Sequence, residues 1–587
     1  MNKARINELY KAREYRDVRE IINEAVNLYP NNIAFKIKEK DEQGNKIYKN
    51  ITYLEMQKDI NALGTSFIDV GLKNEKIAII GKNRYEWIIS FFSAMNGTGV
   101  AVPLDKGLPE EEIELLCKRS RAKAIVFSKE YIDTFLKICK NKTTNLELFI
   151  CMDEFEKEYS EEDKFGNQIT SYKELIKNGN TLLKKGKKAF INAKINNDEL
   201  AELVFTSGTT SSSKGVMLSH KNIASNISEM KKCEKIYPND VNMAFLPFHH
   251  TFGSTGIIMF LSHGATNVFC DGLRHIQENL KEYKVSTFVC VPLLLEAMYK
   301  KIYREIEKKG KQKVVEKGIK ISNVLLKVGI DIRRKLFKDI INSLGGNLRF
   351  IISGASAIDK KVAKGFNDFG ILTIQGYGLT ETAPVLCAEN AKNIRYGSVG
   401  HPLSGVNVKI FEPNEEGIGE IIAKGDNVML GYYEDTEATN KVLKDGWFYT
   451  GDLGKKDKDN YFFITGRQKN VIVLKNGKNI YPEEIEEIIN KLPYVDESMV
   501  FGYPKDDDLI VSVKIVYNKD YVQANLGDIS NEELHKKIWE DIKQINSGLT
   551  NYKHMKKLII TDEPMVKTST AKIKRFIEIE NIIKEGK

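Results

Sequence analysis

The chain is poor in cysteine and contains no CxxC pair. Its seven cysteines are scattered along 587 residues, and their number is odd. This usage argues against a disulfide framework and against a cysteine-ligated zinc site, and it favours the reducing cytosol. Residues 1–20 are densely charged and lack the apolar core of a signal peptide. We therefore expect a cytoplasmic protein.

Long hydrophobic runs are also missing. The uncharged stretch of residues 87–104 is interrupted by Gly97, Gly99 and Pro103, which predicts a helix, a turn and a strand rather than a membrane span. The formal net charge of +9 is compatible with anionic ligands but identifies none of them. No interleaved aromatic and basic pattern indicates nucleic acid, so we expect no nucleic-acid partner.

Short apolar runs alternate with longer amphipathic segments, and this alternation predicts an α/β fold of layers with largely parallel sheets. The chain is too long for one ordinary core. We therefore predict a large N-terminal domain over residues 1–466 and a small α+β C-terminal domain over residues 467–587, joined by a hinge. The predicted strands are residues 77–80, 124–127, 287–291, 350–352, 498–501 and 510–516, and the predicted helices are residues 85–95, 110–117, 363–369 and 484–492.

Residues 206–215, TSGTTSSSKG, carry the most informative pattern. They follow the apolar run 203–205 and consist of hydroxyl side chains, two glycines and one lysine. Glycines let backbone N–H groups approach an anion, and the hydroxyls and the lysine add donors and charge. The segment lacks the GxxxxGK[ST] order of a Walker A loop. It predicts a polyphosphate-binding loop, and a flexible polar surface turn is the alternative.

Four further motifs follow in a fixed order, and each would be weak alone. They are residues 375–382 (QGYGLTET), 446–454 (GWFYTGDLG), 465–470 (TGRQKN) leading into 475–486 (KNGKNIYPEEIE), and 567–575 (KTSTAKIKR). Together with the loop, this set resembles the adenylate-forming superfamily, which includes acyl-CoA synthetases, luciferases and peptide-synthetase adenylation domains. The likeness extends from about residue 33 to residue 575.

The resemblance implies ATP and CoA as co-substrates and Mg²⁺ as the metal. Glu381 and Thr209 would hold Mg²⁺, Lys572 would be the catalytic lysine, Lys469 the hinge, and Gly477 a residue on the CoA side. The tyrosine of the second motif would stack on adenine. The residues expected to bind ATP or AMP are Thr206, Ser207, Gly208, Thr210, Lys214, Gly354, Ala355, Ser356, Gly376, Tyr377, Gly378, Thr380, Asp452 and Arg467.

The chemistry of acid activation fits these residue types. A carboxylate becomes a good acyl donor once it forms a mixed anhydride with AMP, and that step brings two anions together. A metal and lysines must therefore neutralise charge, and no protein nucleophile is needed. The sequence departs from the family at Ala571, where glycine is usual, and at Ser211 and Ser213, where glycine and proline are common. None of these changes removes a chemically active group.

Residues 246–253, LPFHHTFG, resemble the substrate-side motif of the family, with His250 at the usual spacing to Gly253. The pair His249 and His250 resembles bacterial long-chain acyl-CoA synthetases. Two histidines that cap a helix or lie in the core are the alternative. Residues 296–341 are rich in lysine and arginine with apolar residues between them, which suits either an anionic membrane surface or a solvated helical face.

We therefore expect ATP-dependent activation of a medium- to long-chain fatty acid to an acyl adenylate, then transfer to CoA. Lys572, Glu381, Thr209 and His250 are the predicted catalytic residues. The alternatives are an aryl or short-acid CoA ligase, a fatty acyl–carrier-protein ligase and, from another class, a non-catalytic nucleotide sensor, which would not need Lys572. Monomer and homodimer both remain open, as does the acyl chain length.

Overall fold

The computed structural model describes residues 7–156, 169–206, 213–475, 478–505, 508–567 and 572–586. The chain forms two compact units. The first comprises Met1–Thr206, Ser213–Val408 and Ala423–Phe448, and the second contains Lys409–Ile422 and Tyr449–Lys587. The second unit thus includes residues 449–466, which lie ahead of the predicted domain limit.

The larger sheet of the first unit has nine strands, in the order β16-β15-β14-β13-β12-β10-β11-β1-β2. The six strands from β14 to β1 are mutually parallel, and the edge strands β16, β15 and β2 are antiparallel. The predicted parallel arrangement is confirmed. The strands are β1 (Ile33–Lys40), β2 (Lys46–Thr52), β10 (Val241–Ala244), β11 (Thr266–Phe269), β12 (Thr287–Cys290), β13 (Phe350–Ser353), β14 (Leu372–Gly378), β15 (Val385–Ala388) and β16 (His401–Pro402).

A second sheet of the same unit has eight strands, in the order β19-β9-β8-β4-β3-β5-β6-β7. Its strands from β8 to β7 are parallel, whereas β9 runs antiparallel to both β8 and β19. The strands are β3 (Lys76–Ile80), β4 (Val100–Leu104), β5 (Ala124–Phe127), β6 (Leu148–Cys151), β7 (Ile169–Ser171), β8 (Leu200–Thr206), β9 (Lys214–Ser219) and β19 (Gly431–Tyr432).

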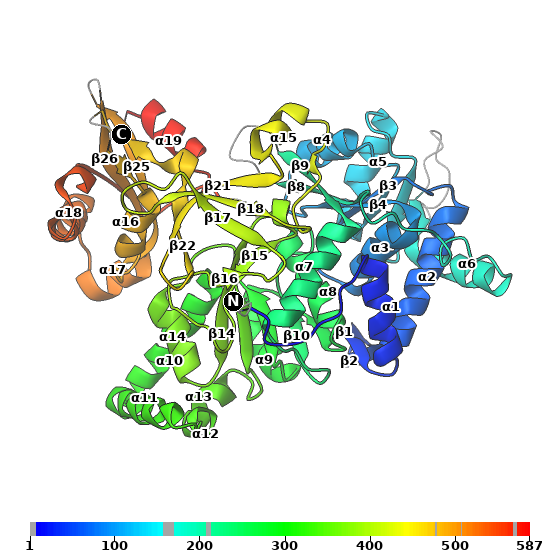
Figure 1. Ribbon diagram of the computed structural model, residues 1–587, viewed down its shortest axis with the longest axis horizontal. Helices are drawn as coiled ribbons and strands as arrows, with labels where there is room; N and C mark the ends of the chain where they lie inside the picture. Colours follow the sequence, from blue (N-terminus) through cyan, green and yellow to red (C-terminus); the bar gives the residue numbers. More distant parts are fainter. Residues whose placement is uncertain are drawn as a thin grey trace. The chain divides into compact units, whose positions relative to one another are not determined.

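Five helices fill the space between these two sheets (Figure 1). They share one apolar core with the inward residues of both sheets, such as Ile77 and Ile79 of β3 and Phe35 of β1. Because side chains alternate along a strand, Ala78 and Ile80 face the opposite side, where α4 (Glu110–Ser120) and α5 (Ile132–Asn141) cover them. The five inner helices are α1 (Val18–Leu28), α2 (Tyr53–Asp69), α3 (Tyr85–Ser93), α7 (His220–Cys233) and α8 (Thr251–Leu261).

The outer faces of both sheets carry further helices. On the nine-stranded sheet, Phe288 and Ile351 pack against α10 and α14. The predicted helices and strands named above are found, with limits shifted by a few residues. The remaining helices of the first unit are α4 (Glu110–Ser120), α5 (Ile132–Asn141), α6 (Tyr172–Lys184), α9 (Ile276–Glu282), α10 (Pro292–Lys308), α11 (Gln312–Lys327), α12 (Arg333–Leu336), α13 (Lys338–Ser343), α14 (Lys360–Asp368) and α15 (Thr436–Val442).

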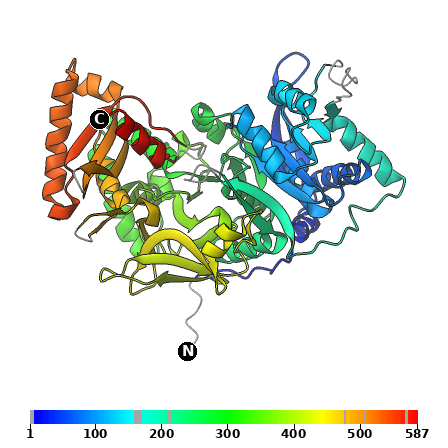
Figure 2. The same ribbon diagram turned by 90° about the horizontal axis from the view of Figure 1, so that it is seen from above.

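The second unit contains a three-stranded sheet, β25-β26-β27, with helices on both faces. Ile538 and Ile542 of α18 pack with Val513 on one face, and Ile582 of α19 packs with Met499 on the other. Figure 2 shows the orange-red helix α18 and the red helix α19 on opposite sides of the orange strands. This arrangement confirms the predicted α+β unit. Its elements are β25 (Val495–Lys505), β26 (Asp508–Tyr517), β27 (Lys557–Thr561), β23 (Ile472–Val473), β24 (Asn479–Ile480), α16 (Pro482–Ile489), α17 (Lys519–Leu526), α18 (Asn531–Ser547) and α19 (Arg575–Lys584).

A further sheet has five strands, which come from the chain segments between β16 and β19 and after β19 in the sequence. It consists of β17 (Asn407–Phe411), β18 (Gly419–Lys424), β20 (Leu443–Lys444), β21 (Trp447–Lys456) and β22 (Phe462–Arg467). No helix among the described residues is long and apolar enough to cross a bilayer.

Candidate active site

Two of the predicted ATP-side residues of the first unit, Lys214 and Glu381, are brought together by a third residue. Tyr432 donates a hydrogen bond from its hydroxyl to Oε1 of Glu381 over 2.9 Å. The Nζ atom of Lys214 lies 4.6 Å from the centroid of the Tyr432 ring, within the range of a cation–π contact. The sequence did not point to Tyr432, because a tyrosine after a glycine is common and carries no charge or metal-binding group.

Backbone pairing fixes this group of three. Strand β19 pairs with β9, so that Tyr432 faces Val216, two residues after Lys214. The Met429 N–H donates to the carbonyl oxygen of Glu381 over 2.9 Å. Burial, and less strongly the neighbouring Glu381 charge and hydrogen bond, raise the pKa of Tyr432. The tyrosine therefore stays neutral and keeps its hydroxyl proton for the glutamate.

The predicted phosphate loop begins and ends on neighbouring strands. Thr206 at the end of β8 is the register partner of Lys214 at the start of β9, and its hydroxyl lies 3.4 Å from the Lys214 carbonyl oxygen. Arg119 of α4 donates to the carbonyl oxygen of Ser213 over 2.7 Å. Ser207, Gly208, Thr209 and Thr210 lie outside the described residues.

The two predicted adenine-side segments follow adjacent parallel strands. Ser353 and Gln375 are register partners in β13 and β14. Residues 354–356 therefore follow β13 at the carboxyl edge of the parallel strands, where α/β proteins bind ligands, and residues 376–378 end β14 beside them, paired with β15. A Cβ at Gly354 would lie 2.8 Å from the Phe252 ring, so only glycine fits without a shift. Ala355 has φ +72°, in the region that glycine prefers.

The substrate-side motif forms the first turn of α8. His250 is its N-cap residue, and a Cβ at Gly253 would lie 2.1 Å from the Pro247 carbonyl oxygen. The ring centroids of His249 and His250 are 4.2 Å apart. An apolar pocket, named here the α8 pocket, opens beside this turn, and no charged side chain lines it. It is lined by Asn242, Met243, Ala244, Phe245, Leu246, Phe248, Phe252, Gly253, Gly256, Ile257 and Val289.

In the second unit the predicted ribose-binding residues form a cross-strand pair. Asp452 and Arg467 are register partners in β21 and β22, and Nε of Arg467 lies 3.1 Å from Oδ1 of Asp452. The aspartate side chain is 7% exposed. Two residues further on, Lys469 lies in the short turn Gln468–Asn470. Desolvation, with a smaller contribution from Arg467, lowers the pKa of Lys469 to about 8.

The predicted catalytic Lys572 is exposed and precedes α19. The next turn is anchored firmly, because Arg575 donates to Glu486 and to the carbonyl oxygen of Val500. The Lys574 N–H also donates to the carbonyl oxygen of Val566 over 2.8 Å. This anchoring holds the backbone that carries Lys572 against the C-terminal sheet. Gly477 and Ala571 lie outside the described residues.

Comparison with known families identifies this arrangement. A family model described as "AMP-binding enzyme" matches residues 22–433. The chain belongs to the AMP-binding enzyme family. A second model, "AMP-binding enzyme C-terminal domain", matches residues 469–581. The predicted superfamily is thereby confirmed.

Relatives of this AMP-binding enzyme match most of its length. It is 30% identical to long-chain-fatty-acid–CoA ligase 5 of Rattus norvegicus, over 90% of this chain and 83% of the relative. It is 29% identical to long chain acyl-CoA synthetase 4 of Arabidopsis thaliana, over 84% and 77%. It is 26% identical to the chloroplastic long-chain-fatty-acid–acyl-carrier-protein ligase AEE15 of the same plant, over 89% and 80%.

Solved structures share the fold of this AMP-binding enzyme. The anthranilate CoA ligase AuaEII in complex with anthranoyl-AMP superposes with a TM-score of 0.74 at 18% identity, covering 97% of this chain and 98% of that one. ATP-bound MatB from Rhodopseudomonas palustris superposes with a TM-score of 0.71 at 22% identity, covering 96% and 100%. The predicted α/β fold class is confirmed.

The donor set of this AMP-binding enzyme suits magnesium at Glu381. Mg²⁺ prefers hard oxygen ligands and usually keeps several waters, so one or two carboxylates suffice to hold it. The hydrogen bond from Tyr432 involves Oε1, and an ionised carboxylate can accept several partners. Lys214 lies beside the same tyrosine.

Proposed function

We propose that this protein is an ATP-dependent long-chain fatty acid–CoA ligase. It would convert a medium- to long-chain fatty acid to an acyl adenylate with release of pyrophosphate, and then transfer the acyl group to CoA with release of AMP. The α8 pocket carries the proposal, because it adjoins the substrate-side motif and is lined by apolar side chains. Similarity to long-chain ligases over most of the chain supports it.

The pocket selects for an alkyl chain by its lining. Each CH₂ that enters such a surface contributes about 0.8 kcal/mol to binding. Gly256 leaves space on the α8 side, because a Cβ there would lie 3.6 Å from Val289 Cγ2, an ordinary contact. The cavity as it stands has a volume of about 20 Å³, so an acyl chain would enter by widening it between α8 and β12.

Residues of the first unit would offset the negative charge of the ATP phosphates. Lys214 would attract phosphate oxygens, and Tyr432 would orient Glu381. A magnesium ion held by Glu381 would neutralise phosphate charge when ATP is bound. Attack of the fatty acid carboxylate on the α-phosphorus forms the mixed anhydride, and Lys572 would offset the charge of the two anions. The thiolate of CoA then takes the acyl group.

Two other acids or acceptors would fit the same chemistry. An aryl or short-acid CoA ligase would differ from the proposed enzyme in its acid pocket. A fatty acyl–carrier-protein ligase would differ in the thiol that accepts the acyl group. Pyrophosphate release should be measured for acids from acetate to oleate and for benzoates, with CoA, with carrier protein and without a thiol. The highest kcat/KM should belong to acids of eight or more carbons with CoA. Acid-independent ATP binding without pyrophosphate release would instead indicate a nucleotide sensor.

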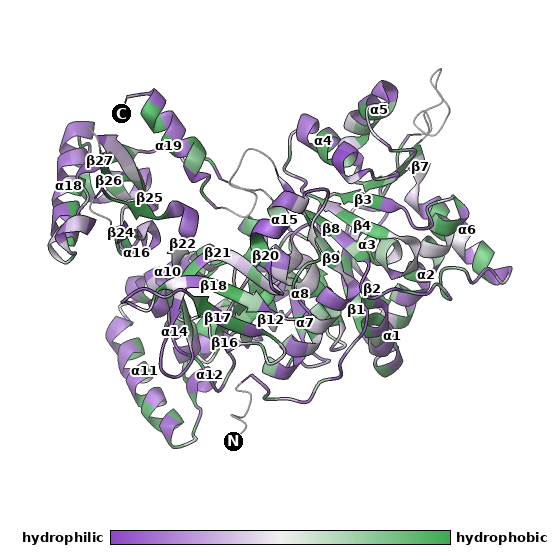
Figure 3. Ribbon diagram, turned by 45° about the horizontal axis from the view of Figure 1, so that its top comes forward, coloured by the Kyte–Doolittle hydropathy of each residue, from purple (hydrophilic) through white to green (hydrophobic). Residues whose placement is uncertain are grey.

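We further propose that the segment α10–α13 contacts anionic membrane surfaces. Helix α11 buries only Gly318 and Ser322 among its residues. Ile321 and Val324 are 57% and 63% exposed, and purple and green residues alternate along this helix in Figure 3. Its lysines would attract anionic lipid head groups while the apolar side chains enter the interface. The lysines of α11 are Lys313, Lys317, Lys320 and Lys327.

A further inference from the structure

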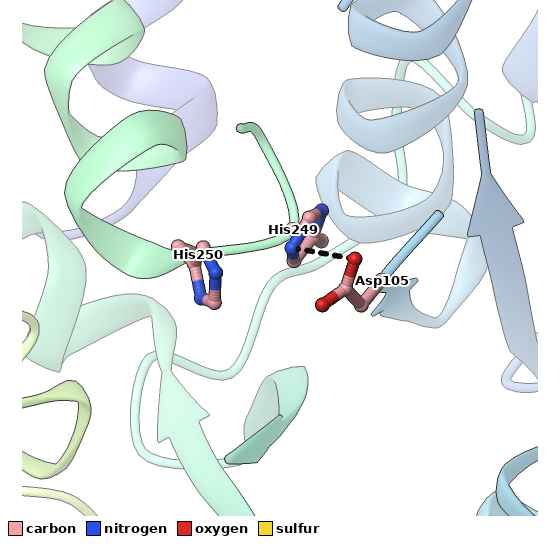
Figure 4. Close-up of side chains that lie close together, drawn as sticks. All are labelled: Asp105, His249 and His250. Atoms are coloured by element: carbon pink, nitrogen blue, oxygen red, sulfur yellow. Dashed lines mark ion pairs between the residues drawn. The ribbon is translucent and has the colours of Figure 1, made fainter. Parts of the chain in front are cut away.

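Three side chains of types that can bind metals lie close together at the start of α8 (Figure 4). Asp105 directly follows β4 of the eight-stranded sheet, whereas His249 and His250 follow β10 of the nine-stranded sheet. One ligand atom of each residue lies within 4.8 Å of the other two. The cluster therefore joins the two sheets of the first unit, although Asp105 is more than 140 positions away from the two histidines in the sequence.

The contact between Asp105 and His249 has an unusual geometry. Nε2 of His249 lies 3.3 Å from Oδ1 of Asp105, yet within the described residues this nitrogen makes no hydrogen bond. His249 is 6% exposed, and burying a polar nitrogen without a hydrogen bond is costly. The contact with the Asp105 carboxylate is thus an ion pair that falls short of a hydrogen bond.

A shared metal ion accounts for that separation. Zinc binds histidine nitrogen and carboxylate oxygen at roughly 2.0–2.2 Å in a tetrahedron, so two of its ligand atoms lie about 3.4 Å apart. The distance between His249 and Asp105 matches one edge of such a tetrahedron. His250 is further away and would need a side-chain rotation toward the pair. Its ring faces the same space in Figure 4.

The carboxylate is also held in place by the backbone. The Gly107 N–H donates to Oδ1 of Asp105 over 2.8 Å. Hydrogen bonds of this kind orient metal ligands in proteins and are part of functional metal sites. Two histidines and one carboxylate suit Zn²⁺, Co²⁺ and related ions, whereas Mg²⁺ prefers an all-oxygen shell.

We propose that Asp105, His249 and His250 form a binding site for a divalent transition-metal ion of the Zn²⁺ type, separate from Glu381. The ion would tie the end of β4 to the first turn of α8. Phe248 and Phe252 flank the two histidines and line the α8 pocket, so an ion here would stiffen the pocket wall. This proposal does not depend on the acid or thiol that the protein uses.

Metal binding by the full chain tests the proposal directly. The protein is stripped with a chelator, dialysed, and titrated with Zn²⁺ against a chromogenic chelator in a large excess of MgCl₂. We expect one Zn²⁺ per chain with an affinity that Mg²⁺ does not change. Asp105→Asn and His249→Gln should each weaken this affinity by at least about tenfold. Co²⁺ should give visible bands of a nitrogen- and oxygen-ligated tetrahedral site.

A matched control is available on the surface of the same unit. Nδ1 of His275 lies 2.9 Å from Oε2 of Glu278, so His275→Ala removes another histidine–carboxylate pair without touching the cluster. This variant should bind Zn²⁺ like the natural chain. Thiolate bands with Co²⁺ would overturn the proposal. Equal Zn²⁺ affinity in the natural chain and in the three variants at residues 105, 249 and 275 would also overturn it. Absence of Zn²⁺ binding by a natural chain with native circular dichroism would also overturn it.

Discussion

Tyr432 reaches Glu381 with its hydroxyl and holds Lys214 over its ring. The three residues come from a short edge strand, a 3-10 turn and the strand that follows the predicted phosphate loop. One tyrosine thus contacts a negative and a positive side chain to which the family resemblance gives roles toward the metal and the phosphates. The hydrogen bond from the Tyr432 hydroxyl can be tested separately from the contact that its ring makes with Lys214.

Replacing Tyr432 by phenylalanine should reduce adenylate formation and leave the cation–π contact intact. A hydrogen bond to a charged group contributes about 1.5–3 kcal/mol, so kcat/KM for ATP should fall by roughly tenfold to a hundredfold. The Mg²⁺ concentration needed for half-maximal pyrophosphate exchange should rise. Tyr433→Phe is the control, because it removes a neighbouring hydroxyl from the same strand end. Equal kinetics in both variants would exclude an orienting role for Tyr432.

Replacing Lys572 by alanine should separate the two half-reactions. Loss of a preorganised charge donor typically slows a step by about 10²–10³-fold, and we expect this loss in pyrophosphate exchange. Consumption of CoA with synthetic acyl-AMP should change little. Lys584→Ala removes an exposed lysine of α19 that pairs with Glu580 and serves as the control. If Lys572→Ala slows both half-reactions equally, its assignment to adenylation is wrong.

The length of the acyl chain should depend on residue 256. Gly256→Leu would place a branched side chain in the α8 pocket beside Val289. Exclusion of two methylene groups costs about 1.6 kcal/mol at 0.8 kcal/mol each, so kcat/KM for oleate should fall at least about tenfold relative to octanoate. Gly256→Ala should have little effect, since its Cβ makes an ordinary contact. An unchanged oleate-to-octanoate ratio in Gly256→Leu would place the acyl chain elsewhere.

Binding to vesicles tests the α11 surface. The double variant Ile321→Ser and Val324→Ser should sediment less with phosphatidylserine vesicles than the natural chain does, and high salt should reduce binding of both. Leu273→Ser is the control, because Leu273 is 70% exposed in a different segment. Equal sedimentation with neutral and anionic vesicles would contradict the proposed contact.

Glu202 should make the stability of the first unit depend on pH. Burial raises the pKa of Glu202 to about 8, well above the ordinary value of a glutamate. The folded chain therefore holds a proton that the unfolded chain loses above its ordinary pKa. Stability should be highest at acidic pH and fall by up to about 1.4 kcal/mol per pH unit as the pH rises toward 8.

The glutamine variant isolates this contribution. Relative to the natural chain, Glu202→Gln should become progressively more stable in thermal unfolding between about pH 5 and pH 8. Glu199→Gln, at an exposed position nearby, should not change the pH dependence. Parallel unfolding curves for the natural chain and Glu202→Gln would show that Glu202 is ionised throughout.

The sequence predicted the central strands well because they are short apolar runs buried on both faces. Residues 77–80 and 124–127 lie in β3 and β5, next to each other in the eight-stranded sheet. The order of motifs was sufficient for the superfamily. Contacts between side chains distant in sequence could not be predicted in this way. The bond from Tyr432 to Glu381 depends on the pairing of β19 with β9, which no local pattern specifies.

The same limit applies to the cluster at α8. The sequence singled out His249 and His250 through their motif, but Asp105 is an ordinary residue after an apolar strand. Only the stacking of two sheets on a common helix layer brings it to the histidines. The cross-strand pair of Asp452 and Arg467 was predicted as a functional pair by resemblance, and its physical basis is the register of β21 and β22.

The helix layer between the two sheets has a consequence for dissecting this protein. Helices α7 and α8 are covered by a sheet on each side, so either sheet alone would leave one side of them in water. We expect neither sheet with these helices to fold as a separate fragment, and the amides of α7 and α8 to be among the slowest to exchange with solvent. The α8 pocket and the Glu381 group should therefore be lost together, in one cooperative unfolding event.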